Sequence, residues 1–266
     1  MHELAALRLQ IEWGADEALE AEPVDRLRQT ATARPTAMEA GPKAPVVAPA
    51  LVVAPAPVPS GSSAERARLA AERASTLAEL GAGISGFDGC RLRDTAAHTV
   101  LAEGDPSSGL LLIGEAPSAD DDRSGRPFTG AAGEYLDRML ASVGLDRRSM
   151  LVSPLLPWRP PGDRPPSQTE LATCLPFLMR LIVLSRPRLL MLCGPLSARA
   201  VLGAGAGRRI QRGKWVEVRP VGDIAPVRAL PTHSPDLVRR DPSLRRDAWA
   251  DLRTLRRALD ELIAAK

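Results

Sequence analysis

Short apolar runs alternate with longer amphipathic segments along residues 63–266. Apolar runs at about 109–113, 149–156, 188–193 and 227–230 have the length and flanking residues of buried strands. Between these runs, apolar positions recur at the three- and four-residue spacing of helices that bury one face. Strands that alternate with helices predict an α/β fold built on a doubly wound, mostly parallel sheet.

Capping residues predict where several helices begin. A capping box over residues 62–65 predicts a helix to about Leu80, which glycines over residues 81–86 end. A second capping box over residues 167–170 predicts a helix to Leu184. The other predicted elements are helices over residues 134–143, 195–202 and 242–265, and a hairpin or irregular strands over residues 208–230.

The first 62 residues differ from the rest in composition. An amphipathic segment over residues 3–20 predicts a helical appendage within residues 1–30. Residues 31–62 contain seven prolines among Ala and Val, a composition that favours an extended, disordered linker. A plain spacer and a docking peptide are both compatible with this linker. The main domain is predicted over residues 63–266.

The 266-residue chain has a net charge of only +3, but its charges are unevenly distributed. Residues 207–266 carry fourteen Lys and Arg residues against eight acids. Such a region is compatible with a surface that binds a polyanion, and also with ordinary solvated helix faces. Three cysteines, the lack of a secretory signal and the lack of a long apolar run argue against a disulfide scaffold or a membrane span. We therefore expect a cytoplasmic protein.

The most informative stretch begins with the predicted strand at Leu110 and continues to Asp137. The strand stops at Gly114, and a long polar loop rich in acids, prolines and glycines separates it from the next helix. In open α/β sheets, ligands bind in such loops beyond the carboxyl ends of strands. The single aromatic residue of this loop, Phe128, is either a binding residue or an anchor for the loop.

This stretch resembles the first motif of the uracil-DNA glycosylase superfamily, in particular its family-4-like bacterial branch. The matching residues are Gly-Glu-Ala-Pro-Ser at 114–118, Asp121-Asp122, and Gly-Arg-Pro-Phe-Thr-Gly-Ala-Ala-Gly at 125–133. Further matches are Arg-Pro-Pro-Gly-Asp-Arg at 159–164, His-Ser-Pro-Asp-Leu-Val-Arg at 233–239 and Arg-Asp-Ala-Trp-Ala-Asp-Leu at 246–252. The resemblance covers about residues 64–262 and implies a three-layer α/β/α fold with a central, mostly parallel sheet.

The resemblance also implies an activity, the hydrolysis of the N-glycosidic bond of uracil in DNA during base excision repair. Breaking this bond leaves a uracil anion and a cation-like sugar, so an enzyme points donors at the oxygen that gains negative charge. His233 is the implied donor, and Glu115 and Asp121 are the implied carboxylates that position water and stabilise the sugar. The target base must leave the duplex, which favours mismatched or single-stranded DNA.

Other residues are implied to hold the base or the DNA. Backbone amides after Gly114, including that of Ala116, are placed to hold the base edge, and the ring of Phe128 is placed to stack on the base. The residues implied to contact DNA, largely through phosphates, are Arg159, Ser234, Arg239 and Arg240. DNA is the only implied partner, no membrane is involved, and a monomer is expected.

Family-4 enzymes bind an iron–sulfur cluster through four cysteines, but this chain matches only half of that set. The matching positions are Phe87, Cys90, Trp158 and Cys174. Because two of them are apolar aromatics, we expect no cluster and no other cofactor, and we expect packing in the cluster's place. A cluster-free branch of the family, with Trp before Arg-Pro-Pro, is the closer resemblance.

A second departure concerns base selectivity. Where the family has an Asn that reads the uracil edge and helps to exclude cytosine, this chain has Pro154 after Ser153. Proline has neither an amide side chain nor a backbone N–H, so this discrimination must be lost or rebuilt, for example by the Ser153 hydroxyl. Two alternatives follow. One is a DNA-binding module with weakened or absent catalysis, and the other is a glycosylase for another deaminated base such as hypoxanthine or xanthine.

Overall fold

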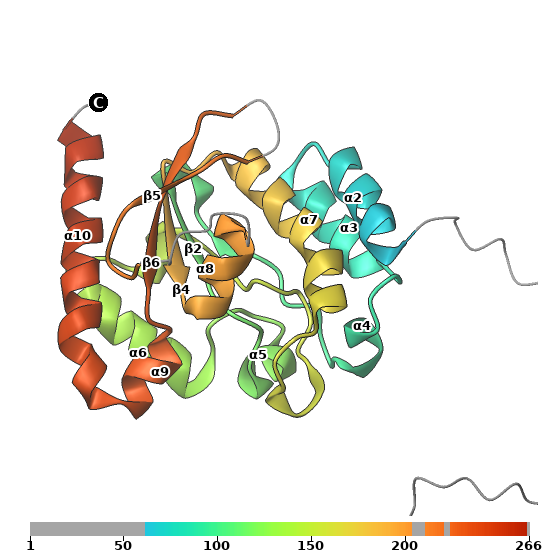
Figure 1. The fold of residues 1–266 in the computed structure, drawn as a ribbon, viewed down its shortest axis with the longest axis horizontal. Helices are drawn as coiled ribbons and strands as arrows, with labels where there is room; N and C mark the ends of the chain where they lie inside the picture. The colour runs from blue at the N-terminus through green and yellow to red at the C-terminus, as the bar shows by residue number, and fades with distance from the viewer. Residues whose placement is uncertain (1–61, 204–210, 221–223, 265–266) are drawn as a thin grey trace, which may run out of the picture. The chain divides into compact units, whose positions relative to one another are not determined.

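The computed structural model of the chain describes residues 62–203, 211–220 and 224–264 (Figure 1). The strands within these residues are β1 (Glu103–Gly104), β2 (Leu110–Ile113), β3 (Leu151–Ser153), β4 (Leu189–Cys193), β5 (Val216–Val218) and β6 (Val227–Thr232). They form one sheet in the order β1-β3-β2-β4-β6-β5. The four inner strands run parallel, whereas the edge strands β1 and β5 pair antiparallel.

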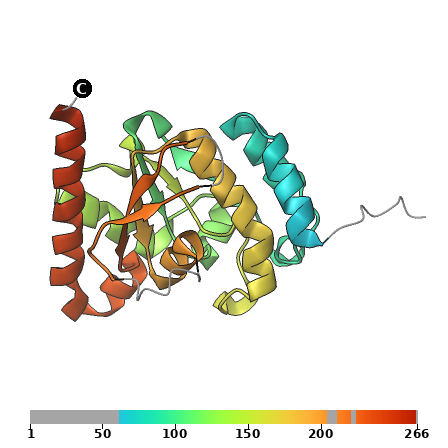
Figure 2. The same ribbon diagram turned by 45° about the horizontal axis from the view of Figure 1, so that its top comes forward.

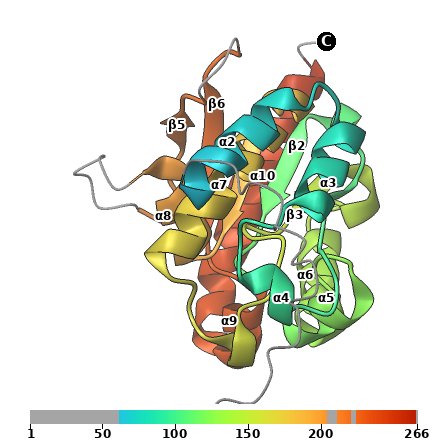
Figure 3. The same ribbon diagram turned by 90° about the vertical axis from the view of Figure 1, so that its right-hand side faces the viewer.

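Helices cover both faces of this sheet. On one face lie α2 (Ser63–Arg73), α3 (Leu77–Gly86), α7 (Gln168–Ser185) and α8 (Pro195–Leu202). On the other face lie α6 (Gly130–Ala141), α9 (Pro235–Arg240) and α10 (Arg245–Ala264). Figure 2 shows α10 on one side of the sheet and α7 with α2 on the other, and Figure 3 shows α2 next to α7. The predicted three-layer α/β/α fold with a mostly parallel sheet is therefore confirmed.

The alternation of side chains along β2 explains why its sequence is apolar throughout. Leu111 and Ile113 pack into the core on the α7 face, whereas Leu110 and Leu112 pack into the core on the α10 face. Successive side chains of a strand point to opposite faces, so a strand covered by helices on both faces needs apolar residues at every position. The same holds for β4, whose five residues are all buried.

Several predicted elements are confirmed close to their expected bounds, among them β2, β4, α7 and α8. The capping box of α7 is present. The Ser167 hydroxyl accepts from the N–H of Glu170 at 3.2 Å, and the Glu170 carboxylate accepts from the N–H of Ser167 at 2.7 Å. The predicted hairpin is confirmed in part, because β5 pairs antiparallel with β6.

The single helix predicted from Ala64 to Leu80 is wrong, because two helices occupy this segment. The chain leaves α2 at Ala74 and re-enters a helix at Thr76, whose hydroxyl accepts from the N–H of Glu79 at 3.1 Å. Thr76-Leu-Ala-Glu79 is itself an N-cap sequence, and it starts α3 anew. The glycines expected to end the helix lie inside α3 instead.

Two short helices of the structure were not predicted from the sequence. The acidic stretch after β2 forms α5 (Ala119–Ser124), with a capping box between Ser118 and Asp121. The segment after His233 forms α9, with Ser234 as its N-cap and Pro235 as its first residue. Ser followed by Pro, or by an acid three residues later, is a helix start signal that these short segments carry.

The helical appendage predicted over residues 1–30 and the linker predicted over residues 31–62, apart from Ser62, lie outside the described residues. The part of the predicted hairpin over residues 204–210 and 221–223 also lies outside them. Within the described ranges, no helix combines the length and apolar character required to cross a lipid bilayer.

Candidate active site

A cavity of about 680 Å³ lies beyond the carboxyl ends of the inner strands. Its walls come from the loop and helix after β2, the Arg-Pro-Pro loop after β3, the start of α8 after β4, and α9 after β6. Four loops that are far apart in sequence meet here because parallel strands place their carboxyl ends at one edge of the sheet.

This cavity brings together most of the residues implied by the resemblance. Those lining it are Glu115, Ala116, Asp121, Phe128, Ser234, Arg239 and Arg240. Gly114, Arg159 and His233 are not among its lining residues, but each is next to one of them or in contact with one. Ser153 and Pro154 line a separate, mainly apolar cavity of about 450 Å³ beside α3 and α7.

Glu115 joins the cavity to the first turn of α8. Its Oε1 atom accepts from the N–H of Leu196 at 3.0 Å, whereas its Oε2 atom accepts no hydrogen bond from the described residues. Burial raises the pKa of Glu115, and the Leu196 N–H and the charge of Arg199 oppose that rise. The N-cap of α8, Gly194, has φ 119°, and a Cβ atom there would overlap the Glu115 carboxyl group. The site therefore requires glycine at position 194.

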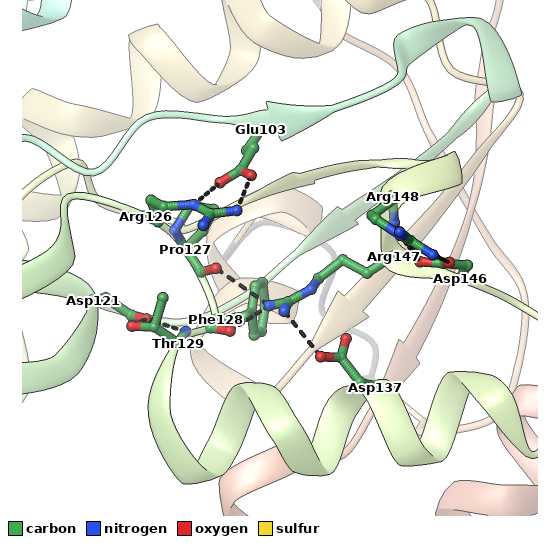
Figure 4. Close-up of polar contacts among 10 residues, drawn as sticks. All are labelled: Glu103, Asp121, Arg126, Pro127, Phe128, Thr129, Asp137, Asp146, Arg147 and Arg148. Carbon is green, nitrogen blue, oxygen red and sulfur yellow. Dashed lines mark hydrogen bonds and ion pairs between the residues drawn. The ribbon is translucent and has the colours of Figure 1, made fainter.

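The carboxylate of Asp121 is largely occupied by backbone and hydroxyl donors. Its Oδ1 atom accepts from the N–H and the hydroxyl of Thr129 at 2.6 and 2.8 Å, and its Oδ2 atom accepts from the N–H of Ser118 at 2.9 Å. Asp121 is only 8% exposed. These contacts tie α5 to the Phe128 loop (Figure 4), so Asp121 holds the loop in place and leaves little acceptor capacity for water.

Phe128 has a backbone conformation that is uncommon for an aromatic residue, with φ 55°. Two glycines make room for it. A Cβ atom on Gly114 would lie 2.6 Å from Cζ of Phe128, and a Cβ atom on Gly133 would overlap the Phe128 carbonyl group. The ring therefore lies directly against the end of β2, at the cavity wall.

His233 follows β6 and immediately precedes α9. Burial lowers the pKa of His233, and the positive charge of Arg212 lowers it further. The carboxylates of Asp251, Asp247 and Asp241 oppose this change. The imidazole is therefore neutral at pH 7, and a neutral imidazole donates from one ring nitrogen.

A buried carboxylate fixes the end of the strand that presents His233. Asp251 of α10 is 3% exposed and accepts from the Thr232 hydroxyl at 2.8 Å and from Arg212 at 2.6 Å. Asp251 is the second acid of the Arg-Asp-Ala-Trp-Ala-Asp-Leu stretch at 246–252. Its role was not predicted from sequence, since nothing there pairs position 251 with position 232.

The implied DNA-binding residues carry their own acidic partners. Arg239 and Arg240 both pair with Asp236, at 2.9 and 2.7 Å, and Arg159 pairs with Asp163 at 2.7 Å. The hydroxyl of Ser234 caps α9 by accepting from the N–H of Leu237. Arg199 of α8 also lines the cavity, is exposed, and has no ion-pair partner among the described residues. Arg199 was not predicted as a site residue. Its only signal in the sequence is its position about one turn into the helix that follows a strand, and this signal is weak.

The four positions that match cluster ligands lie together in the core on the α7 face. The Sγ atoms of Cys90 and Cys174 are 4.0 Å apart, Trp158 donates from its indole N–H to the Thr99 hydroxyl, and Phe87 packs edge-on against a second phenylalanine. The whole chain has three cysteines, and the third lies in β4. This set does not fit a cluster that uses four thiolates.

Comparison with known proteins agrees with this geometry. Residues 101–253 match the family model of the uracil DNA glycosylase superfamily. The type-4 uracil-DNA glycosylase of Pyrobaculum aerophilum is 34% identical over 174 residues, which cover 64% of this chain and 87% of the relative. The type-4 uracil-DNA glycosylase of Archaeoglobus fulgidus is 32% identical over 171 residues, which cover 62% of this chain and 84% of the relative. This chain therefore belongs to the uracil DNA glycosylase superfamily.

Proposed function

We propose that this protein is a DNA glycosylase that hydrolyses the N-glycosidic bond of uracil in DNA. The observation that carries the proposal is a single cavity that unites the Glu115 carboxylate, the Phe128 ring and the α9 residues that follow His233. Each comes from a stretch that matches the family, and the type-4 relatives carry the name of this activity. DNA is the substrate that membership of the superfamily implies.

The geometry supports different roles for His233 and for the backbone N–H groups after Gly114 during base release. Water adds to C1′ of the sugar and gives up one proton, the bond from C1′ to N1 of uracil breaks, and the base leaves with the electron pair as an anion that takes up one proton. The neutral imidazole of His233 donates to the uracil oxygen that gains charge. The N–H groups of Glu115 and Ala116 donate to no described residue and are available to the base.

Glu115 is the better candidate of the two carboxylates for the sugar side of the reaction. Its Oε2 atom is unpaired among the described residues and the side chain lines the cavity. Asp121, in contrast, is committed to Thr129 and Ser118. We assign the water and the sugar cation to Glu115, and to Asp121 the placement of the loop that carries Phe128.

Pro154 favours a second candidate function, a DNA-binding module with weakened catalysis. Pro154 is buried beside the separate apolar cavity, and the Ser153 hydroxyl donates to the Pro154 carbonyl at 2.9 Å. Ser153 reads the base only if its hydroxyl turns away from that carbonyl. The residues at the four cluster positions do not fit a four-thiolate cluster. This supports a protein whose function does not require an iron–sulfur cluster.

Base release from single-stranded DNA that contains uracil tests the proposal, with wild type compared with His233→Ala and Pro154→Asn. We expect release by wild type, a large loss in His233→Ala, and equal or faster release in Pro154→Asn. Release by Pro154→Asn alone would favour the weakened module. If neither wild type nor Pro154→Asn releases uracil, and hypoxanthine or xanthine is released from strands that contain it, the assignment moves to another deaminated base.

A further inference from the structure

Arg147 contacts the loop that carries Phe128 from the side opposite to Asp121. It is the first residue of a short 3-10 turn, Arg147–Ser149, between α6 and β3. Its guanidinium donates to the backbone carbonyl of Phe128 and, at 3.4 Å, to that of Pro127. Its other terminal nitrogen pairs with Asp137 of α6 at 3.0 Å. Figure 4 shows Arg147 between the loop at Pro127 and Phe128 and Asp137 of α6.

The loop needs such support because Phe128 lies in the left-handed region of backbone space. That region is disfavoured for a residue with a Cβ atom, and it persists only where surrounding groups hold it. Asp121 holds the following residue, Thr129, through its N–H and hydroxyl. Arg147 holds the two carbonyl groups of Pro127 and Phe128.

Arg147 differs from its neighbour Arg148 in reach and exposure. The Arg147 side chain is 26% exposed and bridges three segments, whereas the Arg148 side chain is 90% exposed and pairs only with Asp146 two residues earlier. Arg147 is not a lining residue of the cavity, so any effect on the base must pass through Phe128. Arg148 provides a matched control with the same charge and the same turn.

We propose that Arg147 is a positioning residue that sets the ring of Phe128 for stacking on the extruded base. This inference rests on the proposed function for its catalytic consequence, but the placement of the ring is measurable without catalysis. Guanidinium is suited to this role because one planar group donates to two carbonyls and pairs with a carboxylate. A lysine at position 147 keeps the positive charge, but it lacks the planar guanidinium that donates to several acceptors at once.

Fluorine NMR of protein labelled with 4-fluorophenylalanine tests the placement of the ring. The chain has three phenylalanines, so three resonances are expected, and Phe128→Leu assigns one of them. We expect Arg147→Met to shift or broaden the Phe128 resonance and to leave those of Phe87 and Phe177 unchanged. Arg148→Gln should change none of the three. An unchanged Phe128 resonance in Arg147→Met would overturn the proposal.

Single-turnover base release by the same proteins tests the consequence. We expect Arg147→Met to slow release roughly tenfold, Arg147→Lys to slow it less, and Arg148→Gln to match wild type. The double variant Arg147→Met/Phe128→Ala should be no slower than Phe128→Ala alone, because Arg147 acts through that ring. If the two substitutions slowed base release additively in the double variant, the proposal would be refuted. If wild type releases no uracil, the proposed function fails, and the fluorine spectrum alone decides whether Arg147 places the ring.

Discussion

The carboxylate of Glu115 and the backbone N–H of Leu196 are 3.0 Å apart, so one side chain both lines the cavity and caps α8. The N-cap residue itself, Gly194, has no side chain that could accept a hydrogen bond from this N–H. The cap fixes the orientation of the carboxyl group, and the second oxygen accepts no hydrogen bond from the described residues. The two contributions are separable, because glutamine keeps an accepting oxygen and loses the charge.

Glu115→Gln is expected to separate activity from stability. Base release should fall by about 100-fold or more, the usual effect of removing a positioned acid–base group. The free energy of unfolding at pH 7 should not decrease, because burial disfavours the charged form that the variant removes. Glu115→Ala should lower it by about 1 kcal/mol through loss of the cap. Denaturant titration and single-turnover rates check both, and equal destabilisation by Gln and Ala would contradict the prediction.

The pH dependence of base release is expected to respond to Arg212. The pKa of His233 lies below its usual value, partly because of this guanidinium, and the neutral imidazole is the donor. Release should therefore decline as pH falls through the pKa of His233. Arg212→Gln removes the positive charge, raises that pKa, and should move the acid limb to higher pH. Proton NMR titration of the imidazole gives the pKa directly, and Arg73→Gln, on the distant α2, serves as the control.

Asp251 is expected to be among the most sensitive positions for stability. Asp251→Ala leaves the Thr232 hydroxyl without its acceptor at the end of β6, and it removes the buried one of the two carboxylates that pair with Arg212, which keeps Asp247 at 3.0 Å. We expect a loss of about 3 kcal/mol, the low end for a broken buried pair, since Arg212 is one-third exposed. Urea denaturation measures the loss. A change below about 0.5 kcal/mol would show that the network contributes little.

Arg199 is expected to contact a DNA phosphate. It lines the cavity and lacks an acidic partner among the described residues, unlike Arg239 and Arg240. Arg199→Gln should weaken binding to all sequences and reduce the slope of log K against log salt by about 1. Fluorescence anisotropy at several salt concentrations gives this slope. Arg73→Gln should leave it unchanged, and an equal change in both variants would count against a specific contact.

The spacing of apolar residues was enough to predict helices on both faces of a central sheet. The motifs that resemble the family were enough to predict which loops meet at the site. β2 and β4 are apolar at every position, and α7 begins at a complete capping box, so both kinds of element were identified from local pattern. The break between α2 and α3 was missed because the apolar spacing continues across it. Only the cap at Thr76 reveals the second start.

The division of roles between the two acids was not predictable from sequence. Glu115 and Asp121 both stand after β2, and their residue type permits either role. The difference arises from contacts with Leu196 and Thr129, which tertiary structure alone brings into range. Arg147 was missed for the same reason, since its acceptors are backbone carbonyls that leave no mark in the sequence.

The buried aromatics at positions 87 and 158 constrain how this lineage can change. Both side chains are part of one close-packed core with Cys90 and Cys174. Replacing either aromatic by cysteine would open a void, and neither change alone would complete a set of four thiols. Each single replacement therefore costs packing free energy before a set of four thiols is complete. Gain of a four-thiol site at these positions requires both replacements together, so the packing of this core opposes its stepwise assembly.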